Sequence, residues 1–140
     1  MTHTAFDADA FRAFRALPDE GAIQMLNLVR LHTQTTGPDG APCSGAAAYA
    51  EYGRLSAPVL ARLGGRIAWR GRPQMVLIGP SDEAWDIAFI AEYPSAESFT
   101  TMLKDPDYRQ AMAWRQAAAA DSRLIRLHPL DPGAGFGGAD

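Results

Sequence analysis

Two polar side chains stand out in this sequence because their neighbours are apolar. Asn27 lies within the run "MLNLVRL", and Arg115 shares a helical stripe with Tyr108 and Met112. A buried amide must find hydrogen-bond partners, so Asn27 either bonds a neighbouring loop or orients the carbonyl group of a ligand. A buried guanidinium needs an anion, which for Arg115 is a carboxylate of the chain or of a substrate. The candidates within the chain are Asp121, Asp86 and Glu92.

Aromatic side chains form a second group of candidates. Tyr49 and Tyr52 share one stripe of a predicted helix, where they either pack in the core or direct a hydroxyl into a cavity as a donor or acid. Trp69 and Trp85 either wall a site for a planar molecule or pack at a contact between subunits. Arg123 opens the last predicted strand, where it either binds substrate or helps to begin the strand.

The histidines and the cysteine give weaker signals. His32 and His128 end the first and last predicted strands, where two imidazoles at neighbouring strand ends would share a proton or a metal. Their spacing is not that of a metal site, so neither a metal nor a cofactor is predicted. His3 is expected to be disordered. Cys43 lies in a loop without a basic neighbour in sequence, which argues against a nucleophilic thiolate.

The glycines in "LARLGGRIAWRG", residues 60–71, raise the question of a phosphate-binding loop. Such loops follow a strand and lead into the N-terminus of a helix, where N–H groups face the anion. Here Gly64 follows the last apolar residue of a helical stripe, and an extended segment comes after Gly65. The pair is therefore interpreted as a helix stop with a left-handed cap.

Apolar periodicity and breaker residues predict the elements that must position these side chains. Helices are expected at 7–17, at 46–63, after Ser95 and at 106–119, and strands at 22–32, 66–70 with a continuation at 72–79, 84–94 and 121–130. The segment 33–45 is expected to be a loop. After the first helix, the order is strand, helix, strand, strand, helix, strand. This order predicts an α+β, ferredoxin-like βαββαβ fold with an antiparallel sheet.

The same pattern predicts the domain organisation and the assembly. Residues 1–20 form an N-terminal helical extension, 21–130 the ferredoxin-like domain and 131–140 a mobile, Gly-rich tail. Helices on one face of such a sheet leave the other face uncovered, yet the predicted strands are apolar on both faces. A second copy of the sheet is the simplest cover, so we expect a homodimer.

Composition excludes several classes of partner. The chain has 140 residues, 47% of them hydrophobic and 21% charged, and a net charge of −3. Without a basic patch, nucleic-acid binding is not expected. No apolar run reaches the roughly 18 residues of a membrane span, and the N-terminus lacks the apolar region of a signal peptide. With one cysteine and no internal disulfide, a cytoplasmic protein is expected.

Several segments together resemble the DUF1330 family. They are "MLNLVRL", "GGR", "AEYPS", "DPDY" and "ADSRLI", in this order, and the similarity covers about residues 22–128. The resemblance implies the dimeric α+β barrel architecture. The wider superfamily includes cofactor-free monooxygenases, lactone isomerases, dehydratases and haem enzymes, so the resemblance does not fix a reaction. The N-terminal helix and the long loop 33–45 depart from shorter members and would form a lid or extend the dimer contact.

The leading functional prediction is a cofactor-independent enzyme, of monooxygenase or isomerase type, or a binding protein related to one. Its ligand would be a small, mostly apolar, aromatic or lactone-like metabolite between sheet and helices. Arg115 would anchor an oxygen of the ligand, Asn27 would orient it, and Tyr49 or His32 would move a proton. Tyr52, Trp69, Trp85 and Arg123 would contact the substrate. The alternatives are a non-enzymatic dimeric or stress-associated module and, less favoured, a haem-dependent oxidoreductase.

Overall fold

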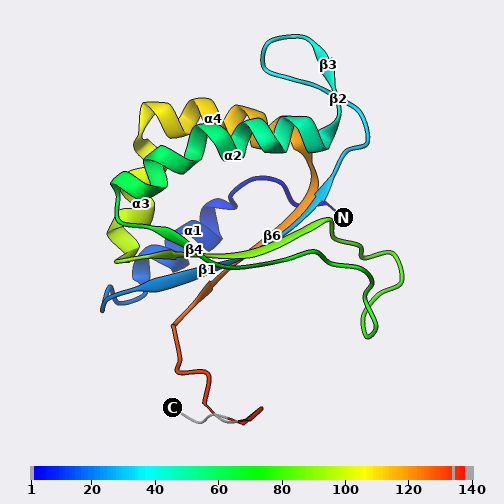
Figure 1. Ribbon diagram of the computed structural model, residues 1–140. Helices are drawn as coiled ribbons and strands as arrows, with labels where there is room; N and C mark the ends of the chain where they lie inside the picture. Colours follow the sequence, from blue (N-terminus) through cyan, green and yellow to red (C-terminus); the bar gives the residue numbers. More distant parts are fainter. Residues whose placement is uncertain (1, 134, 138–140) are drawn as a thin grey trace.

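A computed structural model describes residues 2–133 and 135–137. Its main sheet has four antiparallel strands in the order β4-β5-β1-β6 (Figure 1). These are β1 (Ile23–Leu31), β4 (Arg66–Gly71), β5 (Ile87–Tyr93) and β6 (Ala119–Leu127). With α2 (Gly45–Arg62) between β1 and β4, and with α3 (Ala96–Lys104) and α4 (Pro106–Ala118) between β5 and β6, the predicted ferredoxin-like βαββαβ topology is confirmed.

The two faces of the sheet are set by strict alternation along β1. Ile23, Met25, Asn27 and Val29 are buried, whereas the residues between them are half-buried. The buried set faces α2 and α4, which lie side by side over this face (Figure 1). We call it the inner face. On the opposite, outer face, Leu26 pairs with Ile90 of β5 and with Ile125 of β6.

The helices begin where polar caps stand in the sequence. Ser44 caps α2, Ser95 caps α3 and Asp105 caps α4, in each case by accepting a hydrogen bond from a backbone N–H of the first turn. The helix stop at the paired glycines is confirmed. Gly64 has φ +81°, and the N–H of Gly65 donates to the carbonyl of Leu60 at 2.9 Å.

The N-terminal extension is a folded part of the molecule. Helix α1 (Ala8–Ala16) begins at Asp7, and Phe14 packs against the core. Arg126 of β6 donates to the carbonyl oxygens of Phe14 and Pro18, at 3.1 and 2.9 Å. The carboxylate of Asp19 accepts hydrogen bonds from the first N–H groups of α3. These bonds fix the C-terminal end of the extension to β6 and to the first turn of α3.

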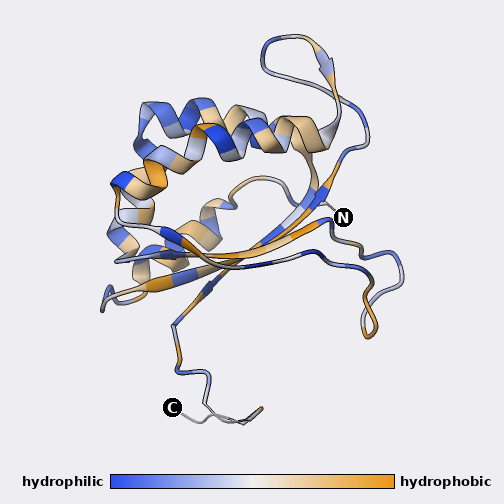
Figure 2. Ribbon diagram, in the orientation of Figure 1, coloured by the Kyte–Doolittle hydropathy of each residue, from blue (hydrophilic) through white to orange (hydrophobic). Residues whose placement is uncertain are grey.

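The predicted strand at 72–79 is wrong, and the predicted strand at 84–94 begins late, at Ile87. Residues 72–86 form an arm without a ladder partner, in which Pro73 lacks a donor and Gly79 has φ +156°. The arm leaves the sheet and carries exposed apolar residues near its tip, with Ile78 94% exposed (Figure 2). Asp86 still attaches to β1, because its N–H donates to the carbonyl of Val29.

Smaller differences concern ends and loops. The expected loop 33–45 contains a short hairpin of β2 (Thr35–Thr36) and β3 (Pro42–Cys43). Strand β6 spans 119–127 instead of 121–130, because α4 passes directly into it at Ala119. The predicted mobile tail lies partly outside the described residues, and its described part holds no helix or strand. Within the described chain, every helix falls short of the length and apolarity that crossing a bilayer requires.

Candidate functional site

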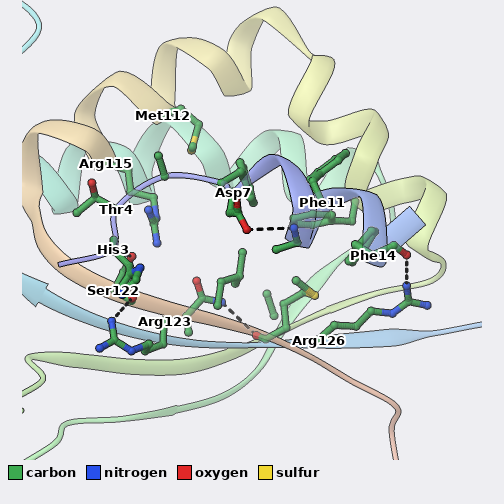
Figure 3. Close-up of a pocket in the computed structure, with 18 of the residues that line it drawn as sticks. His3, Thr4, Asp7, Phe11, Phe14, Met112, Arg115, Ser122, Arg123 and Arg126 are labelled. Carbon is green, nitrogen blue, oxygen red and sulfur yellow. Dashed lines mark hydrogen bonds between the residues drawn. The ribbon is translucent and has the colours of Figure 1, made fainter. Parts of the chain in front are cut away.

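A cavity of about 630 Å³ lies between the inner face of the sheet, the helices and the N-terminal extension. Figure 3 shows its two ends. Arg115, Thr4, His3 and Ser122 gather at one end, whereas Phe11 and Phe14 of α1 lie at the other. The volume is within the range of small-molecule pockets, and the lining combines many apolar side chains with a few polar ones.

Arg115 brings a buried positive charge into this pocket. Its position on α4 directs it toward the sheet, and only 8% of its surface is exposed. Among the described residues, no carboxylate lies within 4.0 Å of its guanidinium group. The three expected partners are engaged elsewhere: Asp121 with Arg123 at 2.8 Å, Glu92 with Arg66 at 3.0 Å, and Asp86 with the N–H of Leu31 at 2.8 Å.

The pocket's own carboxylate does not neutralise Arg115 either. Asp7 is the one acidic residue among the described residues that line the cavity. It caps α1, its Oδ2 accepting from the N–H of Ala10 at 3.3 Å, and its side chain is exposed. Arg126 also lines the cavity, but its guanidinium donates to two backbone carbonyls. The unpaired charge of the polar end is therefore that of Arg115.

Asn27 lies on the inner face at the floor of the pocket and is 7% exposed. Its Nδ2 donates to the carbonyl of Met25 at 3.1 Å, so the amide bonds its own strand and not a neighbouring loop. No described residue donates a hydrogen bond to its Oδ1. An amide can make up to four hydrogen bonds, so Asn27 keeps capacity for a ligand.

Two tyrosine hydroxyls form the roof of the site. The oxygen atoms of Tyr52 on α2 and Tyr108 on α4 are 2.9 Å apart, and both residues line the pocket. Burial raises the pKa of both hydroxyls, so both are protonated at neutral pH. Only one hydrogen can lie between the two oxygens, so the other is available to a third group. The pair can donate a hydrogen bond but is not a base near neutral pH.

The N-terminal extension supplies part of the polar end. The N–H of His3 donates to Asp121 at 2.9 Å, and the Oγ of Ser122 donates to the carbonyl of His3 at 2.8 Å. The Nε2 of Gln116 donates to the carbonyl of Thr4 at 3.1 Å. The expectation that His3 is disordered is therefore wrong, because these bonds hold the segment along β6 and the end of α4.

Phenylalanine rings form the opposite, aromatic end. Phe14 lies 5.4 Å from Phe99 and 6.0 Å from Phe11, between ring centres. Phe6 lies 5.7 Å from Phe11 and 6.4 Å from Phe99. Three of these four rings belong to the N-terminal extension, and all four line the pocket. The extension thus builds an apolar wall that faces the polar end.

The structure gathers some of the predicted site residues and leaves others apart. Arg115, Asn27, Tyr52 and Arg123 line the pocket. Arg123, however, is already bonded to Asp121 and to the carbonyl of Ser122, and its guanidinium lies 5.1 Å from the ring of Trp85. Its proposed contact with a substrate would compete with these bonds.

The other candidates lie outside the lining of the pocket: Tyr49, His32, Trp69 and Trp85. Tyr49 is buried beside Tyr52, and its hydroxyl lies near the guanidinium of Arg115 but makes no hydrogen bond of good geometry within the described chain. Burial and the neighbouring Tyr52 raise its pKa, while the charge of Arg115 acts in the opposite direction. Trp69 pairs with Ile90 on the outer face of the sheet and is 51% exposed. Their roles in a reaction stay predictions.

The expected approach of His32 to His128 is wrong. Their strands are neighbours, as expected, but they run antiparallel, with Leu31 opposite Ala119 and Gln24 opposite Leu127. The two histidines therefore lie at opposite ends of the pair. No group of three or more metal-binding side chains occurs within residues 2–133 and 135–137.

Sequence reasoning expects the N-terminal helix to form a lid or to extend the dimer contact, but it assigns none of the helix's residues to the pocket that they line. A signal was present: Phe11 and Phe14 recur at helical spacing in a helix that the βαββαβ pattern does not require. The helical spacing places Tyr108 on the stripe of Arg115 but does not by itself assign it to the site. Ser122 gave no signal, because its position opposite Val29 depends on the pairing of β1 with β6.

Comparison with known proteins identifies relatives without a stated activity. A family model described as "Domain of unknown function (DUF1330)" matches residues 43–127. Two crystal structures of the RPA0582 protein, a protein of unknown function from Rhodopseudomonas palustris, are similar to this chain. That of the methylated protein is 55% identical, with a TM-score of 0.88, covering 96% of this chain and 100% of its own. The other is 53% identical, with a TM-score of 0.87, covering 94% and 100%.

A third structure is more distant. It is described as a dimeric protein of unknown function with a ferredoxin-like fold from Bacteroides fragilis. It is 14% identical, covers 79% of this chain and 98% of its own, and has a TM-score of 0.49. No curated protein matches the chain.

Proposed function

The chain belongs to the DUF1330 family, and from this premise we propose that it binds a small, mostly apolar metabolite in the pocket between sheet and helices. The observation that carries the proposal is Arg115, a buried cation that faces a cavity without a carboxylate partner among the described residues. An unpaired buried charge lowers stability, so its presence here needs a reason. An oxygen of the ligand as its partner gives that reason.

The polar groups around Arg115 suit chemistry at a carbonyl or enol oxygen. The guanidinium would stabilise negative charge on that oxygen, and Asn27 would orient it. The hydrogen that the Tyr52–Tyr108 pair does not use would donate to the same region. Because both hydroxyls stay protonated, they suit general-acid or hydrogen-bond donation. These residues support a cofactor-independent reaction of the isomerase or monooxygenase type.

The alternative is a dimeric module whose polar residues only build the fold. It predicts a filled interior in which the buried polar groups pair with one another. The cavity of about 630 Å³ and the unpaired Arg115 favour the ligand-binding proposal instead. A binding protein without turnover would share this pocket, and conversion of a bound ligand over time separates the two.

Native mass spectrometry of the wild-type protein and of Arg115→Leu tests the proposal. We expect the wild type to gain mass from members of a panel of aromatic acids, quinols and lactones, and the variant to lose this gain. We also expect the free variant to unfold at a higher temperature, because it no longer buries an unpaired charge. Retained binding in a stabilised Arg115→Leu variant would contradict the role of Arg115.

We also propose that the protein is a homodimer joined through the outer faces of its sheets. The outer face carries the apolar side chains of Leu26, Ile90, Ile125 and Trp69, and no helix among the described residues covers it. Exposed apolar area of this kind is typical of an interface. A second copy presents the same surface, so a contact with two-fold symmetry covers the apolar outer faces of both subunits.

A further inference from the structure

We infer that the ligand is an amphipathic monocarboxylate, with its carboxylate at Arg115 and its apolar body among the phenylalanines of the N-terminal extension. The inference rests on the proposed function and names the class of ligand. Three features of the pocket point to it: its charge, the separation of its polar and aromatic ends, and the contribution of residues 3–17 to each end.

The charge of the pocket favours one negative charge. At the polar end Arg123 is paired with Asp121, which leaves the charge of Arg115. Arg126 keeps its charge but lies at the other end, 4.6 Å from the ring of Phe14, where its guanidinium donates to backbone carbonyls. Arg115 also lies in the last turn of α4, where the helix dipole already compensates a cation in part. A phosphate dianion would therefore exceed the positive charge available and meet the negative end of the helix. A carboxylate matches it and fits the planar fork of a guanidinium.

The remaining polar groups complete a site for two oxygens. The Tyr52–Tyr108 pair has one hydrogen to donate, and the Nδ2 of Asn27 bonds Met25 with only one of its two hydrogens. A carboxylate accepts several hydrogen bonds, whereas a neutral alcohol would leave the charge of Arg115 without an anion. The site thus discriminates between an acid and the alcohol of the same skeleton.

The aromatic end determines what is attached to the carboxylate. Figure 3 shows Phe11 and Phe14 across the cavity from Arg115. The rings of Phe6 and Phe99 extend the same wall, and Leu17 lies beside it. A short acid such as acetate would leave this wall in contact with water. An aryl or medium-chain body would bury it, which favours a ligand with both a charged and an apolar end.

Isothermal titration calorimetry with three probes tests the inference. The probes are 3-phenylpropionate, the alcohol 3-phenylpropan-1-ol, and acetate, titrated at neutral pH into the full-length protein. We expect the wild type to bind 3-phenylpropionate about tenfold or more tightly than the alcohol, as for one charge-assisted pair. Acetate should bind at least tenfold more weakly than 3-phenylpropionate, because it cannot bury the aromatic wall.

Two pocket variants and one control assign the two ends. Arg115→Met should reduce the affinity for the acid to that for the alcohol and leave the alcohol unchanged. Phe11→Ala should weaken the binding of the acid and of the alcohol to the same extent. Because Phe11 lies outside the buried core cluster, the fold should tolerate the change. Arg109→Met removes an exposed arginine from the same helix and should change neither affinity.

The outcomes separate this inference from the proposed function. If the acid and the alcohol bind equally well to the wild type, and Arg115→Met affects neither, the pocket binds ligands but the carboxylate assignment is overturned. If none of the three probes binds even at millimolar concentration, the proposed function and the inference both fail. Loss of acid binding in Arg109→Met would also overturn the inference, because the preference for the acid would then depend on the overall charge of the protein and not on Arg115.

Discussion

The two faces of the sheet differ in which kind of residue is out of place. On the inner face, where a core would be apolar, β1 places Asn27 and β6 places Ser122. On the outer face, where a solvent-exposed surface would be polar, the same strands place Leu26 and Ile125. Strand β1 thus carries a polar residue on the inner face and an apolar residue on the outer face at adjacent positions, Asn27 and Leu26.

This difference indicates two different roles. A polar group inside a fold lowers its stability unless it is satisfied. Ser122 is satisfied by the carbonyl of His3, whereas the Oδ1 of Asn27 has no donor among the described residues, so Asn27 marks the inner face as a site for a ligand. Apolar groups outside a fold lower its solubility unless they are covered, so those of the outer face mark a contact. The predictions below perturb one face and use the other as the reference.

The largest effect is expected from the tyrosines on the inner side. The chain has four tyrosines, Tyr49, Tyr52, Tyr93 and Tyr108, and burial raises the pKa of each above the value of about 10 that it has when unfolded. Above that pH the unfolded chain loses these protons and the folded chain keeps them, so stability is full below pH 10 and falls as the pH rises. Each tyrosine contributes up to about 1.4 kcal/mol per pH unit, so the four together contribute at most about 5.6 kcal/mol per pH unit.

Urea unfolding between pH 9 and 11.5, with tyrosinate absorbance as the probe, measures this loss of stability. At a given pH the folded protein should show less tyrosinate than the unfolded chain, and the signal should rise with unfolding. Tyr49→Phe removes one of the four buried hydroxyls, one that makes no hydrogen bond of good geometry, and should reduce the slope by about a quarter. A smooth titration of the folded protein near pH 10 would show that the inner side is open to water.

A smaller effect is expected from shortening neighbouring side chains of β1. Met25 is 3% exposed and belongs to the core cluster, so Met25→Ala should lower the free energy of unfolding by about 2–5 kcal/mol. Leu26→Ala, on the outer face, should cost less at low protein concentration, and its cost should grow as the protein associates. Denaturation curves at two protein concentrations check both. If both variants lost the same free energy of unfolding at both protein concentrations, the two faces would not differ in the way proposed.

The sequence indicates the architecture because periodicity and breakers are local signals. Alternation in the run around Asn27, the cap at Ser44 and the stop at Gly64 each depend on a few neighbouring residues. The false strand at 72–79 shows the limit of such signals. Residues 75–78 of this segment are apolar, but a strand also needs a ladder partner, and the arm has none among the described residues.

The candidate site was only partly predictable, because it depends on contacts between distant segments. The inward position of Arg115 follows from its helical stripe, but its lack of a partner depends on Asp121 bonding Arg123. The wall of the pocket comes from Phe6 and Phe11, more than 100 residues away from Arg115 in the chain. No local sequence pattern predicts that the N-terminal extension packs against β6.

The last prediction tests the outer face directly by a polar substitution that keeps a β-branched side chain. Ile125 on the outer face is 46% exposed, and Leu124, its neighbour, lies on the inner face opposite Asn27. Ile125→Thr should raise the dissociation constant of the proposed dimer about tenfold, because each dimer then loses two apolar side chains from its interface in exchange for smaller, polar ones. Leu124→Thr should leave it unchanged. Sedimentation velocity over a range of concentrations measures both constants, and equal shifts would show that the apolar outer face is not where the subunits meet.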